Sequence, residues 1–124
     1  MKRLTGEQIA QILKAYGHLV DHNEDKRTAP FDPLTYRAAD DDGVIHFAAF
    51  AGDARTVEWL LDAGENINAT GDMGLTPAHY AAMNLHQDAF DLLMGRGADP
   101  TIRSEFGETP PMTLARALET KGGA

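Results

Sequence analysis

The chain repeats itself at a fixed spacing, and this periodicity constrains the fold more than any other feature of the sequence. Residues 43–49 align with residues 76–82, which places His46 over His79, one aromatic residue over another and one alanine pair over another, at a spacing of 79 − 46 = 33. A fixed period of this length is typical of stacked units that cannot bury their apolar faces alone. We therefore expect an array of repeated units rather than one irregular globule.

Each unit is predicted to contain two helices. Residues 45–51 and 77–84 are short and rich in alanine, which lets neighbouring units approach closely, and these are the expected inner helices. Residues 54–62 and 87–95 place apolar residues at i, i+3 and i+4 with acidic residues between them, as amphipathic outer helices do. A glycine follows each outer helix, where a left-handed C-terminal cap is needed. These glycines are Gly64 and Gly97.

The second unit contains the motif from Thr76 to His79 and, with the period, resembles an ankyrin repeat. The first unit resembles it more loosely, because Gly43 and Val44 stand where threonine and proline are usual. A third unit begins at Gly107, with Met112 where the histidine belongs, and has one expected helix, over about 111–119. The resemblance implies an all-α ankyrin-repeat solenoid of about two full repeats and a C-terminal capping half.

The resemblance also implies structural roles for the signature residues. In this family the histidine hydrogen-bonds the backbone and the threonine side chain, and so braces the turn against the helix, because buried polar groups need partners. The signature positions in this sequence are His46, Thr76, Pro77, His79, Gly64 and Gly97. On this interpretation the histidines are structural rather than catalytic.

The expected boundaries place the repeats at residues 41–118, an N-terminal helical cap and loop at 1–40, and a flexible tail at 119–124. Thr5 is the predicted N-cap of a helix from Gly6 to Asp21, whose apolar stripe would cover the open end of the first repeat. The remainder of the cap is expected to be a polar loop over residues 22–33 and a helical turn over residues 34–39.

Charge and composition exclude several classes of function. Eleven Lys and Arg against 19 Asp and Glu give a net charge of -8, which repels nucleic-acid phosphates and anionic lipid surfaces. The sequence has no cysteine, which excludes disulfides and thiol nucleophiles and agrees with a reducing compartment, so the cytoplasm is the expected location. No stretch has the ~20 apolar residues that span a bilayer, and we expect no signal peptide and no membrane partner.

Histidines and carboxylates near the N-terminus offer an alternative chemistry. His18 and His22 have the i, i+4 spacing of two metal ligands, with Asp21 and Asp25 nearby, but the glutamate and third ligand of a metalloprotease motif are missing. The run from Asp40 to Asp42 lacks the ligand spacing of a calcium loop. Without a recognisable catalytic triad or phosphate loop we expect no enzyme and no cofactor. A metal- or histidine-dependent enzyme that uses His18 and His22 is the alternative.

The predicted functional surface follows from where partners bind proteins of the resembled family: the tips of the turns and the exposed side of the inner helices, which together form a concave face. The residues at these positions are Asp40, Asp42, Phe50, Asp72, Met73, Leu75, Met83, Asn84, Glu105, Phe106 and Glu108. An apolar centre with a charged rim is typical of a binding patch.

This surface predicts another protein as the partner, basic and apolar at the contact, because opposite charges favour encounter. The expected role is that of an adaptor or an inhibitor, for example a toxin-neutralising protein of the immunity type. A homo-oligomeric structural subunit is a further alternative, with the monomer as the default state.

Overall fold

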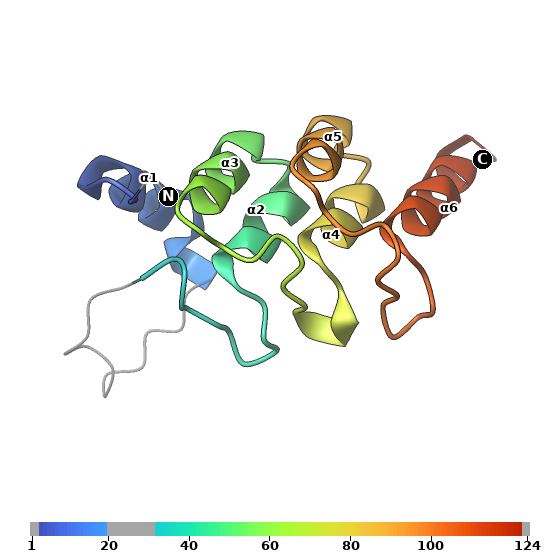
Figure 1. The fold of residues 1–124 in the computed structure, drawn as a ribbon, viewed down its shortest axis with the longest axis horizontal. Coiled ribbons are helices and arrows are strands. Elements are labelled where there is room, and N and C mark those ends of the chain that lie inside the picture. The colour runs from blue at the N-terminus through green and yellow to red at the C-terminus, as the bar shows by residue number, and fades with distance from the viewer. Residues whose placement is uncertain (1–2, 20–31, 123–124) are drawn as a thin grey trace.

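The fold is an array of helix pairs, seen in a computed structural model that describes residues 3–19 and 32–122. Within those ranges every regular element is a helix, so the predicted all-α solenoid is confirmed. The helices are α1 (Gly6–Tyr16), α2 (Val44–Ala51), α3 (Ala54–Asp62), α4 (Pro77–Met83), α5 (Gln87–Gly95) and α6 (Pro110–Gly122), with short 3-10 helices η1 (Gly17–Leu19) and η3 (Asp72–Gly74). Figure 1 shows α1, α3 and α5 side by side in one row, with α2 and α4 beneath them.

The helices of the two full units agree with the predicted ranges. The outer helices α3 and α5 have the expected bounds, and the inner helices α2 and α4 differ from theirs by one residue at one end. Gly64 and Gly97 follow the outer helices with φ of 101° and 98°, the left-handed region that glycine adopts at least cost. The core is continuous along the array, because small alanines of α2 and α4 lie fully buried where these two helices pack together.

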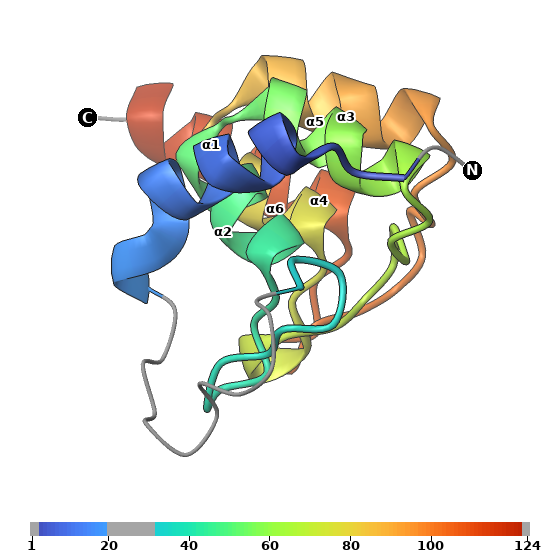
Figure 2. The ribbon, with the colours of Figure 1, turned by 90° about the vertical axis from the view of Figure 1, so that its left-hand side faces the viewer.

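The turns between units repeat the same backbone hydrogen bonds and project from one side of the array (Figure 2). In each turn one N–H donates to the carbonyl oxygen four residues further on. These bonds join Ala38 to Asp42 (2.8 Å), Gly71 to Leu75 (2.9 Å) and Ser104 to Glu108 (2.9 Å). The repeated backbone pattern therefore begins at Ala38, ahead of residue 41, where the sequence placed the first repeat.

The N-terminal helix covers the first unit, as expected. Thr5 caps α1 through a capping box with Gln8, in which each side chain bonds the backbone N–H of the other residue. Ile12 and Tyr16 are buried in the core, and the Tyr16 hydroxyl donates to Asp53 at 2.7 Å. The helix ends at Tyr16 and continues only as η1, so it is shorter than the predicted range, whose end from Val20 to Asp21 lies outside the described residues.

The C-terminal helix is longer than expected. α6 runs to Gly122, so the flexible tail predicted from residue 119 is wrong as far as residue 122, and residues 123 and 124 lie outside the described part. The residues from Thr113 to Lys121 include no glycine or proline and are mostly good helix formers, which explains the extension. At the other end of the chain, the turn predicted over residues 34–39 spans only 33–35, and the loop over 22–33 lies almost wholly outside the described residues.

Candidate functional site

The two signature histidines are buried structural groups. The His79 Nδ1 atom lies 2.9 Å from the Thr76 backbone nitrogen and 2.7 Å from the Thr76 hydroxyl, and its Nε2 atom lies 2.8 Å from the Glu108 carbonyl oxygen. In the first unit Gly43 stands at the position of Thr76, so His46 has no threonine hydroxyl to bond. Its Nδ1 accepts the Gly43 N–H at 2.9 Å, and its Nε2 lies 2.7 Å from the Ala69 carbonyl oxygen, ahead of the next turn. Burial lowers the pKa of both imidazoles, so both are neutral near pH 7. Each histidine therefore joins its own turn, through Nδ1, to the turn region of the next unit, through Nε2.

Exposed apolar side chains recur at the same two positions of successive units, and they form two rows along the array. One row follows the inner helices, and the other follows the tips of the turns. The inner-helix row contains Phe50, Met83 and Arg116, and the turn row contains Asp40, Met73 and Phe106, each spaced by the 33-residue period. The four apolar members are 38–62% exposed, which is unusual for side chains of this size. We call these six residues the two-row surface.

The structure removes two residues from the predicted surface. Asp42 and Leu75 are 8% and 5% exposed, and they occupy equivalent positions at the end of successive turns. In the first two units the side chain at this position is directed inward: Asp42 bonds Asp72 and Tyr80 of the next unit, and Leu75 belongs to the hydrophobic core. Asp42 and Leu75 are therefore largely buried, and each lies in the wall of a hollow on this face rather than on its exposed surface.

The other predicted surface residues lie at or near the two rows. Asp40 and Glu105 are exposed at the turns, and Asp72 is half-buried. The exposed Asn84 side chain donates to the Phe50 carbonyl oxygen at 2.8 Å. Glu108 is half-buried and pairs with Arg116, which donates to it from Nε at 2.7 Å and from Nη2 at 3.0 Å. These bidentate bonds lower the pKa of Glu108.

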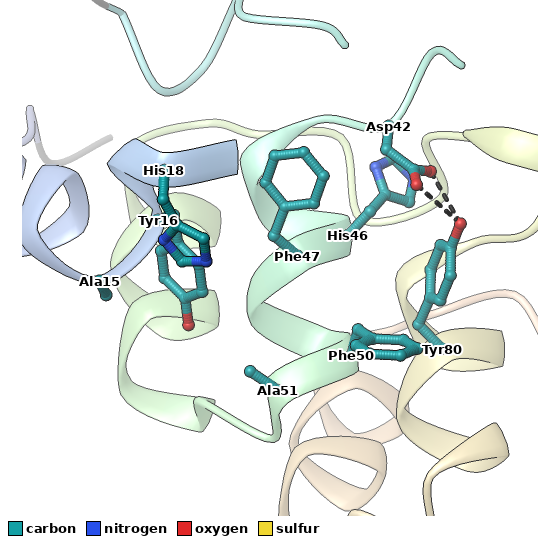
Figure 3. Close-up of a pocket in the computed structure, with 9 residues that line it drawn as sticks. All are labelled: Ala15, Tyr16, His18, Asp42, His46, Phe47, Phe50, Ala51 and Tyr80. Atoms are coloured by element: carbon teal, nitrogen blue, oxygen red, sulfur yellow. Dashed lines mark hydrogen bonds between the residues drawn. The ribbon is translucent and has the colours of Figure 1, made fainter. Parts of the chain in front are cut away.

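Hollows lie along this face, and two of them contain equivalent positions of the repeat. The first hollow has a volume of about 400 Å³ and is shown in Figure 3. It is lined by Ala15, Tyr16, His18, Asp42, His46, Phe47, Phe50, Ala51 and Tyr80. The second hollow has a volume of about 330 Å³ and is lined by Leu75, Met83, Phe106, Glu108, Thr113 and Arg116. Because one hollow includes members of both rows, the rows belong to one continuous face.

A hydrogen-bond network joins the first two units beside the first hollow. The Tyr80 hydroxyl lies 2.9 Å from each carboxylate oxygen of Asp42, and the Asp72 N–H donates to the same carboxylate at 2.9 Å. Figure 3 shows this carboxylate facing the tyrosine hydroxyl, with Phe50 beside the same ring. Burial and the hydrogen bond to Asp42 raise the pKa of Tyr80. The Phe50 and Tyr80 rings meet edge to face, with centroids 5.9 Å apart.

Sequence reasoning missed several residues of this face. Tyr16, Phe47 and Tyr80 line the first hollow, and Arg116 lines the second. The period itself could have indicated Arg116, because it lies 33 residues after the predicted Met83. Tyr16 comes from α1, outside the aligned units, and no repeat signal points to it.

The metal- or histidine-dependent alternative gains no support from the described residues. Within residues 3–19 and 32–122 no three His, Asp or Glu side chains group closely enough to hold a metal ion. His18 is exposed at the edge of the first hollow, whereas His22, Asp21 and Asp25 lie outside the described residues. None of the described helices is long and apolar enough to cross a membrane.

Comparison with known proteins gives a family match over most of the chain. A family model for ankyrin repeats in three copies matches residues 5–104, a range that begins within the predicted N-terminal cap. Human 2-5A-dependent ribonuclease is 31% identical over 102 residues, which are 82% of this chain and 14% of the ribonuclease. Ankyrin repeat-containing protein P1E11.10 of Schizosaccharomyces pombe is 41% identical over 66 residues, 53% of this chain and 32% of that protein. Mouse Rabankyrin-5 is 36% identical over 74 residues, 59% of this chain and 6% of Rabankyrin-5. The chain therefore spans a third or less of each of these relatives.

Proposed function

Because this chain belongs to the ankyrin-repeat family, we propose that it binds one partner protein through its two-row surface and acts as an adaptor or an inhibitor. Ankyrin repeats are protein–protein interaction modules, and the specific role and partner are the proposal. The observation that supports it is the recurrence of exposed Phe50, Met73, Met83 and Phe106 along one face of a rigid array. A preformed face loses little conformational entropy on binding.

The charge around these apolar residues supports a basic partner. Asp40, Asp41 and Glu105 are exposed at the turns that border the rows. Over the whole chain the net charge is -8. Opposite charge on the partner would accelerate encounter, and the advantage would shrink as salt rises. One specific form of this function is an inhibitor that masks the basic surface of a toxin or an enzyme, and in that form occupancy alone is sufficient.

Photocrosslinking tests where the partner binds. A photoreactive phenylalanine replaces Met73, Met83 or Phe106 in turn, and the same residue replaces Glu58 or Asp91 on the outer helices as controls. All five positions are exposed. In lysate of the source organism we expect one crosslinked product of constant mass from the three surface positions and none from the two controls. Crosslinks of equal yield from the outer helices would refute the assignment of the face.

A matched pair of triple variants tests whether the rows supply the affinity. The variant Met73→Ser, Met83→Ser, Phe106→Ser changes three exposed residues of the two-row surface. The variant Leu13→Ser, Met112→Ser, Leu118→Ser changes three apolar residues of comparable exposure outside it. We expect the first to weaken the purified complex at least ~100-fold and the second less than ~3-fold, since buried apolar anchors dominate interface energies. A self-crosslinked product would identify a second copy as the partner and favour the oligomeric alternative.

A further inference from the structure

The last residue of each turn lies beside an inner helix, and in two of the three units it is a carboxylate with different hydrogen-bond partners. Asp42, Leu75 and Glu108 occupy this position in the three units. In the third unit Glu108 pairs with Arg116, eight residues further along the chain, through two short hydrogen bonds. In the first unit the residue at the place of Arg116 is Phe50, so the guanidinium that neutralises Glu108 has no counterpart beside Asp42.

The Asp42 carboxylate has only neutral hydrogen-bond donors among the described residues. They are the Tyr80 hydroxyl and the Asp72 N–H. Arg37, the arginine of the same turn region, instead donates to Glu65 at 3.3 Å and to the Tyr36 carbonyl oxygen at 2.8 Å. His46 is buried with both ring nitrogens engaged and is neutral near pH 7. Both oxygens of this carboxylate already accept neutral hydrogen bonds, so a cation would add a charge-assisted bond to a group that is mostly removed from water and has no ion-pair partner.

The rest of the first hollow suits an amphipathic side chain. Phe47, Phe50 and Ala51 supply an apolar wall on α2, and Tyr80 supplies an aromatic ring next to the carboxylate. An arginine side chain has an apolar three-carbon stem and a planar cationic head, so it can cover such a wall while the head reaches an acid. The guanidinium can also lie over an aromatic ring, which adds a favourable cation–π contact. Exposed Asp40 and Asp41 near the entrance favour the approach of a cation.

We propose that the first hollow is an arginine-binding pocket, in which Asp42 receives the guanidinium of a partner protein while Phe47, Phe50 and Ala51 contact its stem. This inference rests on the proposed protein-binding function and names the chemistry of the partner's anchor. The Arg116 and Glu108 pair shows, within the same chain, the contact that an arginine makes at this repeat position. The second hollow already contains that arginine and has Leu75 in place of Asp42, so it is not expected to bind one.

Small probes test the pocket without knowledge of the partner. Butylguanidinium and butylurea have the same stem and a similar planar head, but only the first is charged. We would titrate each into the intact protein at constant ionic strength and follow backbone amide resonances by NMR. We expect butylguanidinium to shift Phe47, Phe50 and Tyr80 more than Met83 and Thr113, and to bind at least ~10-fold more tightly than butylurea, as charge-assisted hydrogen bonds require.

Three variants distinguish binding of butylguanidinium in the first hollow from its general attraction to the acidic residues of this face. Asp42→Asn retains an acceptor for Tyr80 but removes the charge, and we expect it to weaken butylguanidinium binding about 10-fold. Asp40→Asn removes an exposed charge from the same turn and should change the affinity less than ~2-fold. Ala51→Leu fills the hollow without altering any charge and should also abolish the shifts, so the test stands even if Asp42→Asn does not fold.

Four outcomes would overturn the inference. Equal binding of butylurea would show an apolar hollow with no preference for charge. Unchanged butylguanidinium binding in Ala51→Leu, or equal losses in Asp40→Asn and Asp42→Asn, would show diffuse attraction to the acidic turns. Tighter binding of butylammonium than of butylguanidinium would identify a lysine rather than an arginine pocket. Because the crosslinking positions Met73, Met83 and Phe106 do not line the first hollow, that experiment would still report on the proposed function if the pocket failed.

Discussion

The two hollows have the same place in the repeat but different chemistry. Asp42, Phe50 and Tyr80 of the first hollow correspond by the 33-residue period to Leu75, Met83 and Thr113 of the second. The backbone bonds of the adjoining turns are the same in both places. The repeat therefore determines where a hollow forms, while a few side chains determine whether its inner wall is a hydrogen-bonded carboxylate or an apolar leucine.

The comparison also separates two ways of joining neighbouring units. At the first interface Asp42 accepts hydrogen bonds from two residues of the second unit. At the second interface the equivalent Leu75 is part of the hydrophobic core. A buried carboxylate requires its particular donors, whereas a buried leucine requires only a close-packed apolar surrounding. We expect the first interface to be the more sensitive to loss of a single partner atom.

Exchanging the two residues should give the largest effect. Leu75→Asp places a carboxylate in an apolar site without the tyrosine hydroxyl that serves Asp42, and we expect it to lower the free energy of unfolding by about 4 kcal/mol. Asp42→Leu leaves two donors without an acceptor and should cost about 2 kcal/mol. Urea unfolding followed by circular dichroism measures both. Equal costs would show that the two interfaces are interchangeable.

Removing one hydroxyl at each interface should give an intermediate effect. Tyr80→Phe deprives the buried Asp42 carboxylate of a donor and should cost about 1.5 kcal/mol of unfolding free energy. Thr113→Val removes a 3.2 Å bond to Glu108, which keeps its arginine, and should cost only about 0.5 kcal/mol. The same urea titrations apply, and a larger loss from Thr113→Val would contradict the comparison.

Alkaline titration provides a second readout of the tyrosine at the first interface. The pKa of Tyr80 is raised in the folded protein from an ordinary value of 10.0, so the folded state holds its proton more tightly than the unfolded state. This contribution to stability is complete below pH 10 and is lost progressively as pH rises above it. The unfolding free energy of Tyr80→Phe should therefore fall less steeply above pH 10 than that of the native chain. The pKa of Tyr16 is also raised by burial and by its bond to Asp53, so this tyrosine contributes to the alkaline loss of stability that remains in Tyr80→Phe.

The turns beside the hollows should respond more weakly. Asp41 and Gly74 occupy the same position of successive turns with φ of 73° and 70°. Gly74→Ala places a side chain in this left-handed conformation and should cost about 1 kcal/mol of unfolding free energy. Asp41→Gly relieves the same strain and should change stability by less than about 0.5 kcal/mol, in either direction, because the unfolded chain gains freedom. Thermal unfolding of the two variants measures both changes, and a loss of stability in Asp41→Gly as large as that in Gly74→Ala would contradict this prediction.

The smallest effect on stability near neutral pH should come from the protonation of His46 and His79, which occupy equivalent positions at the two interfaces. Burial lowers the pKa of His46 and His79 below the ordinary value of 6.5, so the unfolded chain binds protons more readily. Stability should be constant well above pH 6.5 and should fall as pH drops below it. His79→Gln should be less stable at every pH but lose less on acidification. If the unfolding free energy of His79→Gln depends on pH as steeply as that of the native chain, His79 does not contribute to the loss of stability in acid.

The sequence predicted the helices well because period, caps and amphipathic spacing agreed. It failed where exposure depends on the direction of a turn residue: the surface assignment of Asp42 and Leu75 follows from their place in turns that bind partners in the resembled family, yet both side chains are largely buried. The alignment of Asp42 over Leu75 was a usable signal of burial, since an inward position accepts an apolar residue in one unit and needs hydrogen-bond donors in another. The first hollow could not be predicted from the repeat, because its wall combines residues of α1 with those of the repeats.

The matching turn bonds define the register in which this array could grow. A duplication that inserts one copy of residues 71–103 would place a turn of the same kind after every outer helix and leave both flanking units intact. An insertion of another length would break those bonds. The new interface would contain a second Leu75 rather than a second Asp42, so the array could lengthen without multiplying its buried carboxylate. Growth in length and change in binding chemistry are thus separable events in the evolution of such a chain.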